Sequence, residues 1–287
     1  MSITFRAKTK QGWTVNAPFE AFTFPGGEAH IKVREDSTEY EYQIADLRGA
    51  DSHDLFTLVM WAEAAAERGE KTVVILPYVP GARADRGTPF AAGVYASFLT
   101  ELVAPDQIII LDPHSETMPL AIMAGRQRLN IFPFERIIRR ELQDGARDNR
   151  PMPYVGVIAP DKGAITRASR AAQVMGVPVY KAEKTRDFET GELTGFTCEP
   201  LPETGKLLIV DDICDGGGTF IGLAQATGIE RSRLDLWVTH GIFSKGIAEL
   251  TYYFDHIYTT DSWGTTEADQ NLTVIPVLPY LTGEINV

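Results

Sequence analysis

Residues 206–220, KLLIVDDICDGGGTF, decide the predicted fold. The first part, residues 207–210, is a short branched apolar run between polar residues, which is typical of a buried strand in a parallel sheet. Two carboxylates, Asp211 and Asp212, stand where that strand is expected to end. A glycine run and a helix-like segment follow. The stretch therefore predicts a strand, an acidic pair, a tight turn and a helix, in that order.

The glycine run after the acidic pair is a candidate anion-binding turn. Glycines allow a tight backbone turn, and their amides can converge on an anion at the start of a helix. The turn comprises Asp215, Gly216, Gly217, Gly218 and Thr219. With the acids accepting hydrogen bonds from sugar hydroxyls, the whole stretch fits a phosphorylated sugar. The alternative is a structural turn whose acids only cap the helix.

Composition limits the function classes. Of the 287 residues, 44% are hydrophobic and 23% are charged, as in a folded chain long enough for two domains. The net charge of −12 argues against nucleic acid or an anionic membrane as a partner. Cys198 and Cys214 match no metal-ligand spacing, and we expect reduced thiols. Without a signal peptide or a long apolar run, the expected location is the cytoplasm.

Strand-like and helix-like segments alternate along the chain. This alternation predicts an α/β protein with two doubly wound parallel-sheet domains. Predicted helices cover residues 51–68, 88–103, 134–144, 163–175, 220–226 and 245–253. Predicted strands cover residues 19–24, 30–33, 72–76, 107–111, 154–158, 178–180, 207–210, 234–238, 256–259 and 274–277. The polar, proline-containing residues 144–153 place the domain boundary, giving an N-terminal domain at 1–146 and a C-terminal domain at 147–287.

Polar residues follow several of the predicted strands. Asp112 and His114 follow the strand at 107–111, and Asp161 follows the strand at 154–158. Ligands of doubly wound sheets bind beyond the carboxyl ends of the strands. These residues and the acidic pair are therefore expected at binding sites.

Six motifs resemble the phosphoribosyl-diphosphate (PRPP) synthetase family, the ribose-phosphate diphosphokinases. LLIVDDICDGGGT resembles the 13-residue PRPP motif, which type I phosphoribosyltransferases share. The others, in the order of the family, are PYVPGARADR (77–86), LDPHS (111–115), APDKG (159–163), KAEKTR (181–186) and THGIFS (239–244). The resemblance runs from about residue 24 to about residue 262. It implies two domains of type I phosphoribosyltransferase-like fold, ATP and Mg²⁺ as co-substrate and cofactor, and a homo-oligomer, either a dimer or a hexamer.

The resemblance also implies a reaction. The anomeric hydroxyl of a ribose 5-phosphate group attacks the β-phosphorus of ATP, and AMP leaves. Lys184 and Arg186 would stabilise the transferring group, because charge spreads over phosphoryl oxygens in the transition state. They begin the polar segment 181–204, which is expected to be a mobile loop that closes over ATP. The alternative for both side chains is a solvated surface position.

The remaining roles divide between metal, ATP and sugar. His114 and Asp161 would contact Mg²⁺, which prefers oxygen ligands and keeps waters; the alternatives are a buried histidine and a helix cap. Asp211 and Asp212 would hold the ribose 2- and 3-hydroxyls, and the glycine turn would hold the 5-phosphate. ATP would be bound by Phe24, Glu28, Arg83, Asp85 and Arg86. For Phe24, which would line an adenine pocket of a neighbouring subunit, the alternative is core packing.

The chain departs from the family pattern at several positions. Gly216 stands where the family has a hydroxyl residue, Ala84 where it has glutamine, and Gly26 where it has an acid. The N-terminal unit is shortened, and the usual final helix is not expected. An open turn at Gly216 would admit a larger acceptor such as ADP-ribose, which stands beside ribose 5-phosphate as an alternative. A phosphoribosyltransferase and a non-catalytic regulatory relative are the competing classes.

Overall fold

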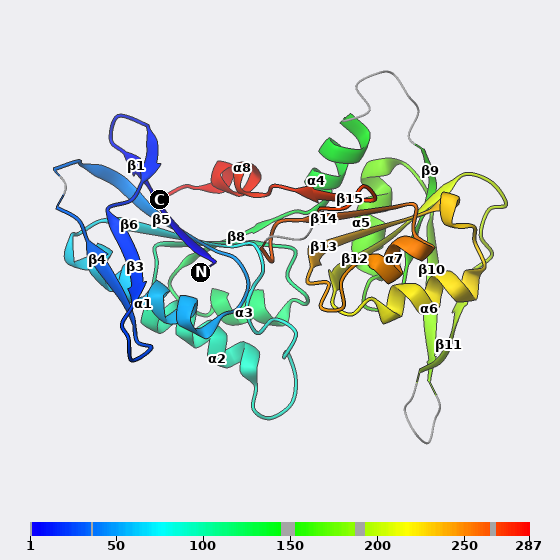
Figure 1. The fold of residues 1–287 in the computed structure, drawn as a ribbon, viewed down its shortest axis with the longest axis horizontal. Coiled ribbons are helices and arrows are strands. Elements are labelled where there is room, and N and C mark those ends of the chain that lie inside the picture. Colours follow the sequence, from blue (N-terminus) through cyan, green and yellow to red (C-terminus); the bar gives the residue numbers. More distant parts are fainter. Residues whose placement is uncertain (1, 36, 145–152, 187–192, 265–267) are drawn as a thin grey trace. The chain divides into compact units, whose positions relative to one another are not determined.

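The computed structural model describes residues 2–35, 37–144, 153–186, 193–264 and 268–287. Its contacts divide the chain into two compact units (Figure 1). Unit 1 comprises Met1–Phe132, Ser262–Gly264 and Val277–Val287, and unit 2 comprises Pro133–Asp261 and Thr265–Pro276. None of the described helices has both the length and the apolar content that a membrane span requires.

Unit 1 is built on a six-stranded sheet with the order β2-β1-β5-β6-β7-β8. Its strands are β1 Ile3–Thr9, β2 Thr14–Asn16, β5 Tyr40–Leu47, β6 Lys71–Leu76, β7 Gln107–Leu111 and β8 Arg128–Phe132. The last four are parallel and follow chain order, whereas β1 is antiparallel to β5 and β2. Because right-handed crossovers that advance in one direction stay on one face, the helices between these strands gather there (Figure 1). They are α1 Ser52–Glu67, α2 Ala91–Ser97 with its π-helical continuation η1 Phe98–Val103, and α3 Thr117–Met123.

The N-terminal segments of unit 1 follow the predicted pattern. A hairpin, β3 Phe19–Thr23 and β4 Ala29–Val33, forms a separate two-stranded sheet. Helix α1 begins after Asp51, whose carboxylate caps it. Its fully buried Trp61 stacks on Phe5 of β1 with ring centroids 5.9 Å apart. The periodic apolar residues of α1 therefore bind the helix to the sheet, as the sequence predicts.

Unit 2 contains a seven-stranded sheet with the order β11-β10-β9-β12-β13-β14-β15. Its strands are β9 Tyr154–Ala159, β10 Val179–Arg186, β11 Leu193–Cys198, β12 Lys206–Cys214, β13 Leu234–Gly241, β14 His256–Thr260 and β15 Leu272–Ile275. All are parallel except β11, which is antiparallel to β10. The chain leaves β9 for β10 on one side and returns to β12 on the other. The order therefore reverses between β9 and β12, where ligands of such sheets bind.

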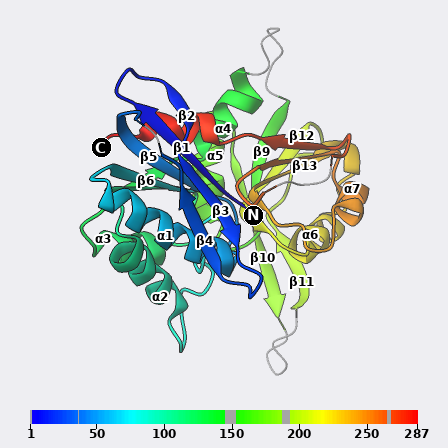
Figure 2. The ribbon, with the colours of Figure 1, turned by 60° about the vertical axis from the view of Figure 1, so that its left-hand side comes forward.

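Helices cover both faces of the unit 2 sheet, so this unit is doubly wound. Helix α5, Ile165–Met175, joins β9 to β10. Helices α6 Gly218–Thr227 and α7 Ala248–Tyr253 pack into one apolar cluster with β12 and β13, on the face away from α5 (Figure 2). The predicted α/β class with parallel-dominated sheets is confirmed. The winding differs between units, because only unit 2 reverses its strand order.

The described part of residues 181–204 forms a hairpin and not an irregular loop, while its closure over ATP stays a prediction. Strand β10 first pairs with β9 and then continues beyond it, where it pairs with β11 from Ala182↔Cys198 to Arg186↔Leu193. Ala182 is fully buried, and Phe196 lies over the backbone of Gly222 in α6. These contacts stabilise the hairpin, which the sequence does not predict because the segment is polar and has no apolar pattern typical of a strand. Residues 187–192, between the two strands, lie outside the described residues.

The helix predicted at 134–144 forms as α4, Glu135–Ile138, and its π-helical continuation η2, Arg139–Asp144. It belongs to unit 2, because Glu135 pairs with Arg170 of α5 at 2.7 Å and the Arg170 guanidinium lies 5.8 Å from the Phe134 ring centroid. The predicted boundary between residues 146 and 147 lies outside the described residues. The division of the structure comes after Phe132, at the end of β8.

The C-terminal segment returns to unit 1. A short helix α8, Leu278–Leu281, places Tyr280 against Phe132 with ring centroids 5.9 Å apart. The Gln107 amide then donates to the Glu284 carbonyl at 2.9 Å. The last residues thereby contact β7 and β8 and belong to unit 1, although the prediction placed them in a C-terminal domain at 147–287.

Candidate active site

The two carboxylates of β12 face one arginine at the point where the strand order reverses. Nη1 of Arg167, in α5, lies 3.5 Å from Oδ1 of Asp211 and 3.5 Å from Oδ1 of Asp212. All three side chains are largely buried. Burial raises the pKa of Asp211 well above its usual value, the Asp212 charge raises it further, and Arg167 opposes both effects. β12 continues to Cys214, so the acids lie within the strand and not after it.

Asp161 and Lys184 meet beside this pair of acids. Asp161 follows β9, and Lys184 lies on the neighbouring strand β10. The Lys184 ammonium donates to Asp161 Oδ2 at 2.7 Å, while Oδ1 accepts from the Ala164 amide at 3.1 Å. The structure thus brings together a residue predicted to bind metal and one predicted to act in catalysis. Arg186 ends β10, and its side chain lies outside the described residues, so its role stays a prediction.

The glycine turn connects β12 to α6. Gly217 has φ +80°, a backbone conformation that favours glycine, and a Cβ there would lie 3.1 Å from Leu250 of α7. Both the backbone conformation and the packing therefore disfavour a larger residue at this position. The first amides of a helix have no partner within it, which leaves those of Gly218 and Thr219 available to an anion, whereas the Phe220 amide already donates to the Gly217 carbonyl. The φ of Gly216 lies outside the left-handed region, so its backbone does not require glycine. The Lys245 side chain packs over it, because a Cβ on Gly216 would lie 3.3 Å from Cε of Lys245. The expected open space at Gly216 is therefore wrong.

Two residues of the predicted ATP site, Asp85 and Arg86, meet in unit 1 after the end of β6, close to residues that follow β7. Asp85 accepts a hydrogen bond from Ser115, next to His114. Nε of Arg86 lies 3.4 Å from Asp85 Oδ1, and 91% of the Arg86 side chain is exposed. The Ser115 hydrogen bond and the nearby charges of Arg86 and His114 lower the pKa of Asp85. Arg86 is thus held at one end and open to a ligand at the other. Arg83 makes contacts of its own in this unit.

Phe24 and Glu28 lie in the turn between β3 and β4. Phe24 is 47% exposed and stacks on His30 with ring centroids 5.4 Å apart, so the core-packing alternative is wrong. The Phe24 amide donates to the Glu28 carbonyl at 2.9 Å, and the Glu28 carboxylate lies over Gly26. An exposed aromatic pair offers a stacking surface for a planar ring. A role in an adenine pocket stays a prediction.

The chain is similar to known phosphoribosyl-transferring and pyrophosphokinase proteins. Residues 130–231 match a phosphoribosyl transferase domain model. A ribose-phosphate pyrophosphokinase of Sulfurisphaera tokodaii is 28% identical over 91% of this chain and 89% of its own length. One from Pyrococcus abyssi is 29% identical over 79% and 77%. The chain thus resembles ribose-phosphate pyrophosphokinases over most of its length. A solved PRPP synthetase of Mycobacterium smegmatis has the same fold, with a TM-score of 0.74 at 21% identity over 94% of this chain and 89% of its own.

Sequence reasoning missed two cations of this site. Arg167 is the third residue of α5, and no motif includes it. The acidic pair could have indicated that a basic residue lies nearby, because two buried carboxylates need a nearby cation. Lys245 directly follows the THGIFS motif, and the sequence assigns it to a helix from 245 to 253. The helix instead begins at Ala248, which leaves Lys245 in a loop.

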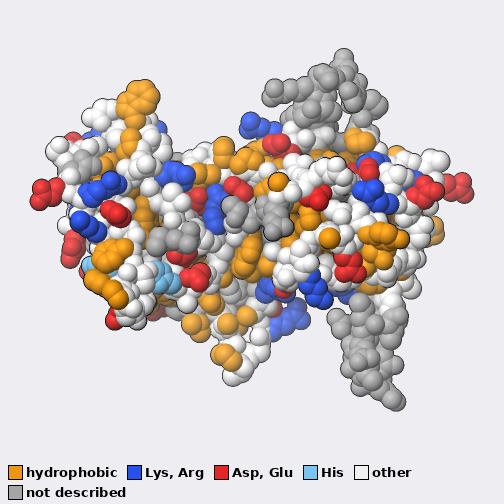
Figure 3. Space-filling view, in the orientation of Figure 1, with side chains coloured by type: hydrophobic (Ala, Val, Ile, Leu, Met, Phe, Trp, Pro, Cys, Tyr) orange, Lys and Arg blue, Asp and Glu red, His pale blue; other side chains and the backbone are white. Residues whose placement is uncertain are grey.

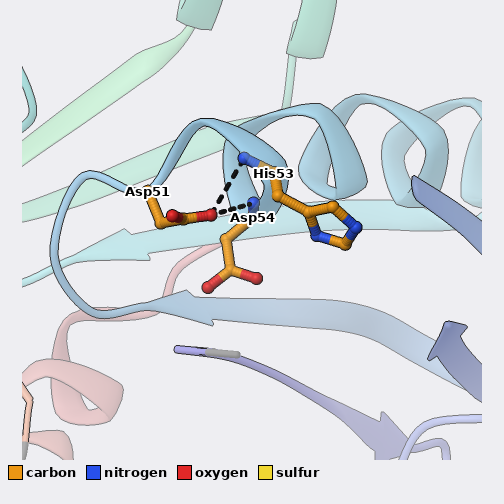
Figure 4. A group of neighbouring side chains, drawn as sticks. All are labelled: Asp51, His53 and Asp54. Atoms are coloured by element: carbon orange, nitrogen blue, oxygen red, sulfur yellow. Dashed lines mark hydrogen bonds between the residues drawn. The ribbon is translucent and has the colours of Figure 1, made fainter. Parts of the chain in front are cut away.

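A separate group in unit 1 has the side-chain types of a metal site. Asp51, His53 and Asp54 place one ligand atom each within 4.8 Å of one another (Figure 4). Each group already has a structural partner. Asp51 caps α1 by accepting from the amides of His53 and Asp54, Asp54 accepts from the Ser2 hydroxyl at 2.6 Å, and His53 Nε2 lies 2.9 Å from the Thr23 hydroxyl. We therefore interpret the group as structural: Asp51 caps α1, and the other two side chains bond the helix to Ser2 and Thr23.

Replacing Asp51 tests this interpretation. Asp51→Ala removes the cap of α1 and is expected to cost about 1 kcal/mol of unfolding free energy. Asp51→Asn keeps an acceptor and should retain most of the stability. Thermal unfolding of both variants with and without Mg²⁺ is the measurement. Stabilisation of the wild type by Mg²⁺ that both variants lose would contradict the structural role.

The donor set of unit 2 suits the Mg²⁺ that the resemblance to PRPP synthetases implies. Asp161 presents a partly exposed carboxylate whose oxygen already pairs with a cation, the Lys184 ammonium. Hard divalent cations take such oxygens together with substrate phosphates. Asp161 thus fits the metal, and it also accepts a hydrogen bond from the Ala164 amide just before α5, although the first turn of that helix has no side-chain cap. His114 lies in the other unit, beside Asp85, and its metal role stays a prediction.

Proposed function

We propose that this chain transfers the β,γ-diphosphate of ATP to the anomeric hydroxyl of a ribose 5-phosphate group. The supporting observation is the grouping of Lys184 on β10, Asp161 just after β9 and the Asp211–Asp212 pair on β12, where the strand order reverses. A cation for phosphoryl oxygens and acceptors for sugar hydroxyls are thereby held on one rigid sheet. The relatives that match most of the chain are named for the same reaction class.

The proposed step forms one bond and breaks one. The anomeric oxygen bonds to the β-phosphorus, the bond from that phosphorus to the α,β-bridging oxygen breaks, and AMP leaves with the electron pair. The hydroxyl proton passes to solvent. Lys184 lies on a strand that can hold its ammonium against the transferring oxygens, where a fixed cation lowers the barrier. Mg²⁺, held by Asp161, would neutralise phosphate charge.

The acid pair and the glycine turn position the acceptor. Asp211 and Asp212 accept hydrogen bonds from the ribose hydroxyls, and Arg167, 3.5 Å from an oxygen of each, helps to hold both carboxylates in place. The turn from Asp215 to Thr219 holds the 5-phosphate at the N-terminus of α6. Orienting the sugar in this way converts an encounter into a near-attack geometry, which is a large part of catalysis for such transfers.

ADP-ribose is the second acceptor that the sequence leaves open. The steric argument for it depends on free space at Gly216, and the Lys245 stem occupies that space. Ribose 5-phosphate therefore leads. The regulatory alternative is disfavoured because Lys184 and Asp161 are both present and in contact.

One experiment tests the reaction and the acceptor together. The protein is incubated with ATP, Mg²⁺ and either ribose 5-phosphate or ADP-ribose, and the products are identified by mass. We expect AMP and PRPP from ribose 5-phosphate. AMP with ADP-ribose pyrophosphate as the main product would move the assignment to the larger acceptor. Release of AMP or ADP without a diphosphorylated sugar would contradict the proposed function.

A further inference from the structure

The Lys245 side chain covers the part of the glycine turn that Gly216 leaves bare. A methyl group placed on Gly216 would lie 3.3 Å from Cε, 3.4 Å from Cδ and 3.7 Å from Cγ of Lys245. Three methylenes of the lysine thus pack where a side chain at 216 would stand. The stem rests on the turn and carries the ammonium along it, as long cationic side chains do on apolar surface.

The backbone holds Lys245 in this position. The loop between β13 and α7 is bonded to the end of β12, since the amides of Ile242 and Phe243 donate to the Cys214 carbonyl at 2.9 and 3.1 Å. The Ser244 amide donates to the Asp215 carbonyl at 3.1 Å. Lys245 is the next residue. The hydrogen bonds of the three preceding residues to the Cys214 and Asp215 carbonyls therefore fix the backbone before Lys245 against the start of the turn.

The Lys245 ammonium is available to a ligand. Its residue is exposed, and no ion pair or hydrogen bond of its side chain is seen within the part of the chain that the structure describes. The stem thus packs on the turn that leads to the free amides of Gly218 and Thr219, and no partner of the ammonium is seen among the described residues.

We infer that Lys245 binds the 5-phosphate of the acceptor and selects a phosphate monoester. This inference rests on the proposed function, since it assumes that the acceptor's phosphate occupies the turn. A monoester carries about −1.5 to −2 charge at neutral pH, and a diester carries one negative charge on each phosphate. A cation added to the helix N-terminus favours the group with more charge at that point. The substrate class is therefore a sugar 5-phosphate and not a sugar whose phosphate is capped.

The test keeps the stem and removes the charge. Lys245→Met preserves the packing on Gly216, and Lys245→Arg preserves the cation. Ribose 5-phosphate, ADP-ribose and ribose are titrated into each variant by calorimetry, and steady-state kinetics give KM and kcat. Lys71→Met, at an exposed lysine that begins β6, is the matched control.

Lys245→Met is expected to weaken ribose 5-phosphate binding about tenfold, consistent with loss of one hydrogen bond to a charged group. Ribose binding, kcat and the KM for ATP should stay near wild type, because a contact equal in ground and transition states changes KM alone. Lys245→Arg should recover most of the affinity, and Lys71→Met should change nothing. Gly216→Ser should also weaken binding, because its side chain displaces the lysine stem.

Three outcomes would overturn the inference. Unchanged ribose 5-phosphate affinity in Lys245→Met would remove the contact. An equal loss of ATP affinity would assign the cation to the nucleotide. A loss confined to ADP-ribose would assign it to a second phosphate. Calorimetry separates these results from failure of the proposed function, because tight ribose 5-phosphate binding without turnover leaves the Lys245 result readable.

Discussion

Lys184→Met is expected to lower kcat by about 10²–10³ and to leave ATP binding nearly intact. The ammonium of Lys184 lies 2.7 Å from Asp161 at the carboxyl ends of β10 and β9, where the transferring phosphoryl group is proposed to lie. Charge grows on the phosphoryl oxygens only as the transfer proceeds. A cation that acts on that charge therefore affects the rate more than the affinity. Single-turnover rates with ribose 5-phosphate and equilibrium binding of ATP are the measurements.

Lys162→Met supplies a matched control from the same neighbourhood. Lys162 directly follows Asp161 and pairs with Glu183 at 3.6 Å, but both side chains are mostly exposed. Exposed pairs contribute little, and this variant should keep the wild-type rate. A similar loss of rate in both variants would show that general charge near β10, and not the Lys184 position, is responsible. Unaltered turnover in Lys184→Met would remove that residue from the mechanism.

Apolar runs and turn residues made much of the fold predictable. Strands such as β6, β7 and β12 are continuous branched apolar segments, because both of their faces are buried. Polar residues that follow such strands were predicted to be functional. Asp161 and His114 indeed lie at strand ends, and Lys184 contacts Asp161. Burial in a parallel sheet leaves a strong local signal, so these elements needed no tertiary information.

The elements that were missed lack that signal. Strand β8 has the sequence RLNIF and lies at the sheet edge with only Phe132 buried, so no apolar run marks it. No element was predicted for α3 either. Strands β10 and β11 are polar because they extend past the sheet, and their stability comes from mutual pairing and from Phe196 packing.

The cations of the site were equally hidden, because their role depends on tertiary position. Arg167 contacts acids that lie 44 and 45 residues further along the chain, and Lys245 covers a glycine 29 residues before it. Neither belongs to a local pattern. Sequence reasoning identified the acids and the glycines that need a partner, while only the fold showed which basic residues reach them.

Asp211→Asn is expected to raise the unfolding temperature while lowering activity. Burial and the Asp212 charge raise the pKa of Asp211, which means that the folded environment disfavours the carboxylate even with Arg167 nearby. Removing the charge should therefore stabilise the protein, by roughly 2–4 °C for each kcal/mol gained. The neutral amide accepts a weaker hydrogen bond from a ribose hydroxyl, so kcat/KM should fall about 10- to 100-fold. Functional sites commonly carry such a stability cost.

The pH dependence follows from the direction of the same shift. A carboxyl group whose folded pKa is raised holds its proton longer in the folded state than in the unfolded state. Wild-type stability from this group therefore falls as the pH rises from the ordinary aspartate pKa through the raised one. The advantage of Asp211→Asn should be full above the raised pKa and vanish below about pH 3.8. Thermal unfolding of both proteins across this pH range measures it.

Asp235→Asn, on the adjacent strand β13, should have the opposite effect on stability. The buried Asp235 carboxylate accepts from the Tyr154 hydroxyl at 2.6 Å, the His256 amide at 3.0 Å and the Lys206 ammonium at 3.2 Å. It lies at the start of its strand, away from the carboxyl ends. Its neutralisation breaks a satisfied network, which costs about 3–5 kcal/mol in comparable buried pairs. A lower unfolding temperature for Asp211→Asn, like that of Asp235→Asn, would show that the Asp211 carboxylate is a structural ion-pair member and that Arg167 outweighs its burial.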